Sequence, residues 1–189
     1  DGNVKYIHYG DIHTKWNSFL DCESDDIPLI QEDRLPKVPF LEDGDLVMAD
    51  ASEDYEGIGT SVEVRNATGK RVVAGLHTLL LRGDKNLLAD GFKGYIQYIP
   101  SFKKALIRIA TGISVYGISK SKIQQTPIHL PSLPEQRAIA TVLSDMDAEI
   151  AALEARRDKT RALKQGLMHE LLTGRIRLVG EQCRVAATP

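Results

Sequence analysis

A stretch of 39 residues, from Glu135 to Thr173, constrains the fold of this sequence more than any other feature, because Gly166 is its only glycine or proline. Alanine, leucine, glutamate, arginine and lysine dominate the stretch, and these residues have the strongest helix propensities. Ser132 stands three residues before Glu135, as in a capping box, and Gly174 follows as a helix stop. A helix of this length spans about 58 Å, which exceeds the width of a small domain. We therefore predict one long helix that either extends from the rest of the chain or pairs with another helix.

Apolar residues in this stretch recur in alternating steps of four and three, which is the spacing of a coiled-coil seam. The seam is apolar at both ends and polar near its middle. Reflection about residue 155 sets Leu143 opposite Leu167 and lays an acid-rich half beside a base-rich half, which favours an antiparallel partner of similar sequence. A lone helix folded onto its own head is the alternative. The expected helix-pairing residues are Ile139, Leu143, Met146, Ile150, Leu153, Leu167 and Leu171.

The rest of the chain alternates between short β-rich runs and turns, which is typical of a mixed α/β domain. The spacing of apolar residues predicts two short helices within residues 86–109, separated at Pro100, and then a loop from Thr111 to Ser119. The expected strands are Val4 to Tyr9, Leu46 to Ala49, Val72 to Val73, Leu76 to Leu81 and a closing strand from Ile123 to Leu130.

These patterns together predict an α+β fold with three parts. The first is a globular mixed α/β head at residues 1–131, and the second is a long C-terminal α-helix at 132–174 that pairs as an antiparallel coiled coil. Residues 175–189 form a tail.

Charge is divided unevenly along the chain, although the net formal charge is only −2. Residues 1–64 hold 4 Lys/Arg against 16 Asp/Glu, or −12, and residues 65–131 hold 11 against 2, or +9. Residues 132–189 hold 9 against 8, which adds +1. A basic segment beside an acidic one suits a domain that presents one face to phosphates and another to solvent or to a protein. The simpler alternative is that the two segments neutralise each other within one fold.

Signatures of enzymes and metal sites are missing from the sequence. It has no Asn/Asp-Pro-Pro-Tyr/Phe stretch and no Gly-x-Gly turn of the kind that an adenine methyltransferase uses, and no complete phosphate loop. The acidic cluster at residues 50–56 is typical of a solvated turn rather than of a nuclease metal site. The five histidines lack ligand spacing, so we expect structural roles for them, with His13 also considered for a contact with DNA.

The sequence also bears on the cellular compartment. No apolar run reaches the roughly 18 residues that a membrane span needs, and no basic-then-apolar leader precedes Asp1. Cys22 and Cys183 lie far apart and lack metal-type spacing, so we expect neither a disulfide framework nor a zinc site. These features predict a cytoplasmic protein without a membrane contact.

Three stretches together resemble the specificity subunits of type I restriction-modification enzymes. They are residues 9–12, residues 110–121, and the pair formed by residues 128–139 and 171–177. The last pair is the most specific, because it combines a proline-framed exit from the head, a Glu-Gln-Arg helix start and a Leu-Thr-Gly-Arg stop. The family usually repeats this head-and-helix unit twice and usually begins with a further strand, so the sequence resembles one half of such a subunit.

The resemblance implies that each head reads one half of a split DNA target and that two antiparallel helices fix the distance between heads. It implies a non-catalytic specificity subunit without cofactors. The expected partners are double-stranded DNA, a second copy of the chain through the long helix, and methyltransferase (modification) and restriction subunits, which would hold S-adenosylmethionine, ATP and magnesium. The alternative from another class is a coiled-coil scaffold whose head binds a protein instead of DNA.

Two polar loops are the candidates for DNA contact, because donors and acceptors on loops can enter the major groove. An ordinary surface turn is the alternative for the first loop, and a rigid packing turn is the alternative for the second. The first loop consists of Lys15, Trp16, Asn17 and Ser18, and the second provides Thr111, Ser114, Tyr116, Ser119, Lys120 and Lys122.

Overall fold

The structure is a computed structural model that describes residues 3–35 and 37–179. The chain forms two compact units, residues 1–142 and residues 143–189. The first unit is the head together with the first turns of the long helix, and the second contains the rest of that helix. Cys183 and most of the predicted tail lie outside the described residues.

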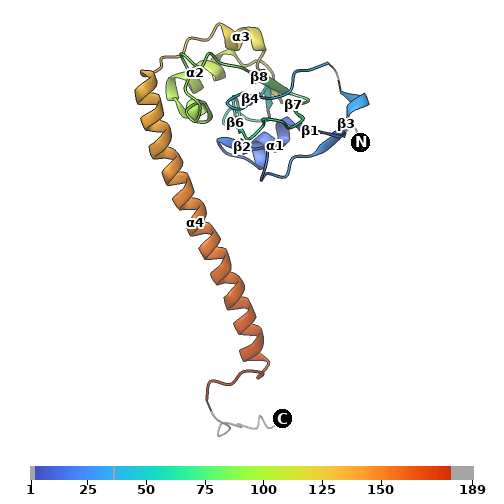
Figure 1. Ribbon diagram of the computed structural model, residues 1–189, viewed down its shortest axis with the longest axis vertical. Helices are drawn as coiled ribbons and strands as arrows, with labels where there is room; N and C mark the ends of the chain where they lie inside the picture. The colour runs from blue at the N-terminus through green and yellow to red at the C-terminus, as the bar shows by residue number, and fades with distance from the viewer. Residues whose placement is uncertain (1–2, 36, 180–189) are drawn as a thin grey trace. The chain divides into compact units, whose positions relative to one another are not determined.

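The head is built around a four-stranded sheet in the order β2-β6-β4-β8. Strand β2 (Phe19–Asp21) pairs in parallel with β6 (Ser61–Arg65), and β4 (Leu46–Ala49) is antiparallel to both β6 and β8 (Thr78–Leu81). These strands lie together in the head in Figure 1. A second sheet has the order β3-β1-β7, from β1 (Asn3–Ile7), β3 (Leu29–Gln31) and β7 (Val72–Ala74). The short strands β5 (Ala51–Ser52) and β9 (Tyr116–Gly117) pair with each other.

Helices pack on the head at several points. They are α1 (Tyr9–Thr14), the 3-10 helices η1 (Glu32–Arg34) and η2 (Lys93–Tyr98), α2 (Pro100–Ile109) and α3 (Lys120–Gln124). The long helix α4 (Leu133–Leu172) follows, with Ser132 directly before it. None of the helices in the described ranges is long and apolar enough to cross a membrane.

Strand β4 separates two hydrophobic cores, because successive side chains of a strand point to opposite faces of its sheet. Val47 and Ala49 belong to a core with Ile12 and Trp16, from α1 and the residues after it. Leu46 and Met48 belong to a second core, whose other buried members come mainly from η2, α2, α3 and α4, namely Phe92, Ile96, Phe102, Leu106, Ile123 and Ala140. The central sheet is therefore covered on both faces.

The start of α4 is fixed to the head by a buried glutamine. The side chain of Gln136 is only 1% exposed. Its Oε1 accepts a hydrogen bond from the Ala89 amide at 2.9 Å, and its Nε2 donates to the carbonyls of Leu87 at 3.0 Å and Pro131 at 2.9 Å. One polar side chain thus satisfies three backbone groups of the head, which buried amides and carbonyls require.

The structure confirms the α+β class and the long helix, which runs from Leu133 to Leu172. It confirms strands at 46–49 and 72–74, and the strand expected at 76–81 begins only at residue 78. Two predictions were wrong. The strand expected from Val4 to Tyr9 ends at Ile7, because His8 is the N-cap of α1 and accepts from the Gly10 amide. The closing strand at 123–130 does not form, because Ser119 caps α3 and places Ile123 in that helix.

Candidate nucleic-acid interface

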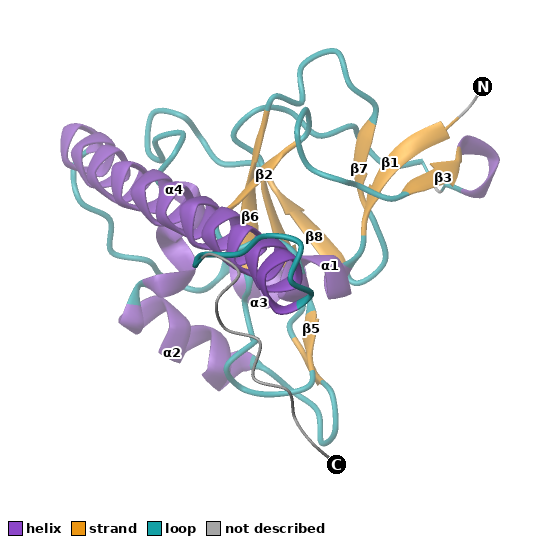
Figure 2. Ribbon diagram, turned by 90° about the horizontal axis from the view of Figure 1, so that it is seen from below, coloured by secondary structure: helices purple, strands orange, loops and turns teal. Residues whose placement is uncertain are grey.

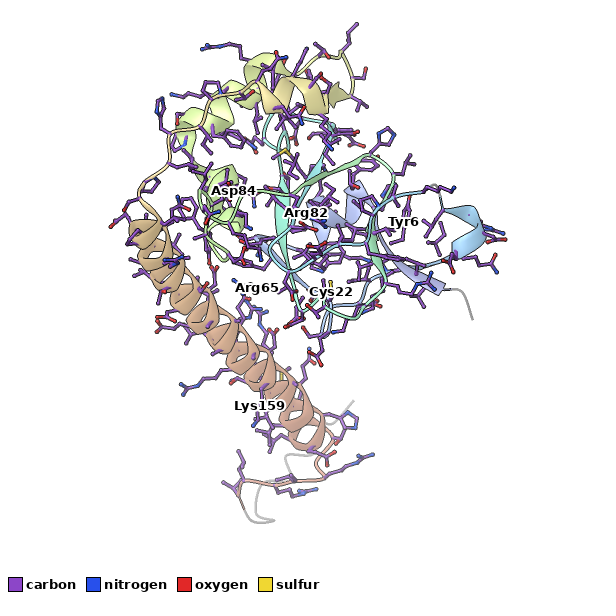
Figure 3. All side chains as sticks on the ribbon, turned by 45° about the horizontal axis from the view of Figure 1, so that its top comes forward. Tyr6, Cys22, Arg65, Arg82, Asp84 and Lys159 are labelled. Carbon is purple, nitrogen blue, oxygen red and sulfur yellow. The ribbon has the colours of Figure 1, made fainter. Side chains whose placement is uncertain are left out.

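The basic segment of the chain divides into a neutralised part and an uncompensated part. Its first cations pair with acids of the head: Lys70 with Glu23, Arg71 with Glu32, Arg82 with Glu42 and Asp45, and Lys85 with Asp90. Arg65 instead lies over the ring of Phe19, 3.3 Å from its centroid; Figure 3 labels Arg65 and Arg82 on the head. In this part of the basic segment, most of the positive charge is therefore neutralised by carboxylates of the head.

The other part contains no acid at all between Asp90 and Glu135. It carries six cations, which are Lys93, Lys103, Lys104, Arg108, Lys120 and Lys122. Lys93 is buried against Asp90. The others come from α2 and α3, which makes the surface of these two helices the uncompensated basic region of the head.

Helix α2 presents its cations to solvent because its apolar side chains are buried. Phe102 and Leu106, four residues apart, enter the core, and Lys104 and Arg108 repeat the same spacing on an exposed face. Within residues 3–35 and 37–179, neither Lys104 nor Arg108 has a carboxylate within ion-pair distance. The sequence prediction omitted both, although the acid-free run around them was a signal that could have found them.

Lys103 has a structural role on the same helix. Its ammonium donates to the carbonyls of Glu56 and Ile58, both at 2.6 Å. Burial lowers the pKa of this lysine, because desolvation disfavours the charged form. Lys103 thus ties the start of α2 to the loop between β5 and β6, and it is not counted among the free cations.

The second predicted loop lies on the exposed surface between α2 and α3. Thr111 and Gly117 exchange backbone hydrogen bonds of 3.0 and 2.8 Å, and Tyr116 packs its ring 4.2 Å from that of Tyr55. The other predicted members of this loop and helix start are exposed: Thr111, Ser114, Ser119, Lys120 and Lys122. Lys122 Nζ donates to the Ile109 carbonyl at 3.0 Å, which leaves Lys120 as the freer cation of α3.

The first predicted loop is only partly exposed, which corrects the expectation for two of its members. Trp16 is 9% exposed and belongs to the core beneath α1, and Ser18 is 6% exposed, directly before β2. Lys15 is exposed and paired with Asp11 at 2.9 Å. Asn17 is the exposed polar residue left, and its carbonyl accepts a hydrogen bond from Gln97 Nε2 at 3.1 Å.

Hydrogen bonds through β5 connect the end of α1, directly before the first loop, with the second loop. His13 Nε2 lies 3.0 Å from the Ala51 carbonyl, and β5 pairs with β9 at the end of the second loop. A surface hollow of about 420 Å³ lies beside them, lined among others by His13, Asn17 and Tyr98. In Figure 2 the loops beside β5 extend from the body of the head, on the side where α2 lies. Candidate contacts from both loops therefore share one side of the head.

An exposed acidic turn also borders this side. Asp54 Oδ1 accepts from the Gly57 amide at 2.6 Å, and Glu53 and Glu56 are exposed. No group of three or more metal-ligating side chains occurs in the described part of the chain. Because carboxylates repel phosphates, α2 and α3 suit a polyanion better than this turn does.

Other candidate chemistry on the head is structural. His8 caps α1, and His77 Nδ1 lies 3.2 Å from Asp50 Oδ1. Cys22 is fully buried, and desolvation raises the pKa of its thiol to about 11, which disfavours the reactive thiolate.

Comparisons with known proteins agree with this picture. Residues 67–161 match the family model of the type I restriction modification DNA specificity domain. The chain is 30% identical over 135 residues to a putative type I restriction enzyme MjaX specificity subunit of Methanocaldococcus jannaschii, covering 69% of this chain and 30% of that protein. It is 29% identical over 97 residues to the type I restriction enzyme MjaVIII specificity subunit of the same organism, covering 51% of this chain and 22% of that protein.

Among solved structures, that of a type I restriction-modification system S subunit from M. genitalium matches with a TM-score of 0.49 and 18% identity. The match covers 90% of this chain and 38% of that chain. The chain spans less than a third of the length of the two curated relatives.

Proposed function

The chain belongs to the family of type I restriction-modification DNA specificity domains, and on this basis we propose that it recognises one half of a split DNA target. In this proposal the chain is a cytoplasmic, non-catalytic module that positions methyltransferase and restriction subunits on double-stranded DNA. S-adenosylmethionine, ATP and magnesium are held by those partners.

The observation that carries the proposal is the set of exposed cations on α2 and α3, unpaired among the described residues, which stand in an acid-free run of the sequence beside an exposed loop. Lys104, Arg108 and Lys120 are exposed there, whereas the cations elsewhere in the basic segment pair with carboxylates of the head or, for Arg65, lie over an aromatic ring. Cations that have no internal partner can replace the counterions of phosphates, which supplies sequence-independent affinity. The adjacent loop at 111–119 and Asn17 then supply groups for the base edges.

The long helix has a separate role in the proposal. Met146, Ile150, Leu153 and Leu167 are all more than half exposed on α4. Their spacing suits pairing with an antiparallel helix, from a second copy or from a matching second half of a longer protein. Such pairing would set the separation of two half-sites. Ile139 packs against the second core of the head, so in this proposal the residues from Met146 onward provide most of the pairing.

A first prediction tests the phosphate-binding surface. Replacing Lys104, Arg108 and Lys120 together with alanine should weaken binding to all DNA sequences alike. The slope of log binding constant against log salt concentration should flatten by about 0.9 for each phosphate that the variant no longer neutralises. Fluorescence anisotropy with random and specific duplexes over a salt series measures both effects.

The matched control is Lys85→Ala, because Lys85 is an exposed lysine of the head that pairs with Asp90 at 3.0 Å. It should leave the slope almost unchanged. If the triple variant keeps the wild-type slope while it still binds DNA, α2 and α3 do not face phosphates. Wild-type binding without a salt dependence would favour a protein-binding scaffold over a DNA reader.

A second prediction concerns base recognition by Asn17. An asparagine can bind adenine through both N6 and N7, and a good bidentate contact discriminates by about 1 to 3 kcal/mol. Asn17→Ala should therefore relax the preference at one position of the target, as seen by selection of bound sequences from a random pool. Asn86→Ala, on another exposed turn of the head, is the control. A uniform loss across all sequences would mean that Asn17 only positions the backbone.

A further inference from the structure

The tip of the loop between α2 and α3 exposes two apolar side chains. Ile113 is 93% exposed and Val115 is 54% exposed. Scattered apolar residues are common on protein surfaces, so exposure alone carries no function. The conformation of the loop and the charges around it indicate a binding role for these two residues.

The loop is held in shape by its own backbone. Thr111 and Gly117 pair as an antiparallel bridge, and the Ile118 amide donates to the Asp50 carbonyl at 2.8 Å. Gly112 has a φ of 147°, and a Cβ at this position would lie 1.8 Å from the Val115 carbonyl oxygen. The chain therefore turns back tightly at Gly112 and presents the two side chains from a short loop that one β-bridge closes.

Cations stand on both sides of the tip in the sequence, at the two ends of the loop. Arg108 lies in the last turn of α2, just before the loop, and Lys120 begins α3, just after it. The bond from Lys122 Nζ to the Ile109 carbonyl holds the start of α3 against the end of α2. An apolar tip on a loop whose two ends carry exposed cations suits a duplex, whose phosphates border a groove lined by base edges.

The major groove has room for an α-helix or a two-stranded β-ribbon, and so for the tip of a tight loop, and the C5-methyl of thymine is the apolar group on its base edges. We propose that Ile113 and Val115 recognise a thymine of the target half-site by contact with its C5-methyl group. This inference rests on the proposed DNA-reading function and adds a chemical identity for one recognised base.

The test removes from the DNA the thymine C5-methyl group that the loop is proposed to contact. Each thymine of the selected half-site is replaced in turn by deoxyuridine, which lacks only the C5-methyl. For the wild-type chain, substitution at one position or at two neighbouring positions should weaken binding about threefold to fivefold, the value of one buried methyl group. Ile113→Ala should bind the thymine duplex more weakly and should no longer distinguish the two duplexes at that position.

Two further variants separate contact from loop damage. Leu87→Ala truncates another exposed apolar side chain of the head, 64% exposed, and should keep full sensitivity to deoxyuridine. Gly112→Ala should lose that sensitivity because its Cβ displaces the tip, while thermal unfolding of the head stays near that of the wild type.

The inference is overturned if no thymine position responds to deoxyuridine, or if Ile113→Ala remains as sensitive as the wild type. A loss of affinity in Ile113→Ala that is equal for every duplex also overturns it, because the tip would then act as a wedge or a positioning element. These results leave sequence-specific binding intact. A wild-type chain that binds no DNA would instead refute the proposed function itself.

Discussion

Replacing Leu167 with alanine is expected to weaken the pairing of α4 with an antiparallel partner helix by at least about 30-fold. Truncation of a buried leucine typically costs about 2 to 5 kcal/mol, and 1.4 kcal/mol corresponds to a tenfold change in affinity. Leu167 is 54% exposed in the single chain, so a partner must supply the burial. In a symmetric antiparallel pair, Leu167 of each helix contacts Leu143 of the other. The substitution therefore removes a leucine contact at both ends of the paired helices.

Ion pairs also favour the antiparallel arrangement, but they contribute less to the free energy of pairing than the buried leucines do. Acids are concentrated at 145–154 and bases at 156–164, which an antiparallel partner brings together. Exposed ion pairs contribute only a few tenths of a kcal/mol each, so they select the orientation while the leucines provide the affinity.

Analytical ultracentrifugation of the full chain over a concentration series measures the pairing. The control is Leu172→Ala, because Leu172 is 81% exposed and falls outside the seam defined by the spacing of four and three. It should pair like the wild type. If both variants weaken association equally, the seam is wrongly placed. A wild-type chain that stays monomeric would exclude a second copy as the partner and leave the matching half of a longer protein.

The elements that the sequence predicted correctly are those specified by neighbouring residues. Strand β4 is a continuous apolar run, and it is buried on both faces of its sheet. Helix α4 is specified by the absence of breakers over tens of residues, and only its ends moved, by one or two residues. Pro100, expected to separate two helices, occupies the first turn of α2, where its missing amide hydrogen has no helical acceptor.

The elements that were missed depend on distant partners. Strand β2 pairs in parallel with β6, so Phe19 stands opposite Glu63 with more than forty residues between them. Glu63 also made β6 hard to predict. A glutamate in a sequence indicates an exposed position, and not one in a buried strand. Glu63 is in fact 1% exposed and accepts from the amides of Gly91 at 2.6 Å and Gly94 at 2.9 Å. Burial raises the pKa of this carboxyl, and its partners have no local sequence signal.

The candidate site, like the fold, could be predicted from the sequence only in part. The loop at 111–119 was identified from its polar and basic residues, and it is exposed. Trp16 was assigned to a surface loop because a lone tryptophan between polar residues has no periodicity, yet it fills the core under α1. The division of cations into paired and free depends on tertiary contacts, such as Arg82 with Asp45, that the sequence does not reveal.

The buried anchor of α4 leads to the second large effect: Gln136→Leu should lower the free energy of unfolding of the head by about 3 to 5 kcal/mol. Leucine has a similar volume but no polar atom. It would leave the buried Ala89 amide and the part-buried carbonyls of Leu87 and Pro131 without their partner. Each buried polar group left unsatisfied costs about 1 to 3 kcal/mol, and partial access of water reduces the sum. Urea unfolding followed by circular dichroism gives the difference directly.

A second substitution at the same position separates the hydrogen bonds from altered packing. Gln136→Glu keeps the shape and the acceptor but replaces the two N–H donors, so a carboxylate would face two carbonyls in a buried site. Burial should raise the pKa of that glutamate above its unfolded value, so the penalty is largest at neutral pH and shrinks as pH falls and the carboxyl becomes protonated. Gln165→Leu, at an exposed position of the same helix, is the control for the substitution itself. Equal stability of Gln136→Leu and Gln165→Leu would show that the three bonds do not hold the first turns of α4 to the head. A loss of stability in Gln136→Leu, together with a pH-dependent loss in Gln136→Glu, would establish that the three hydrogen bonds of the buried Gln136 amide hold the first turns of α4 to the head.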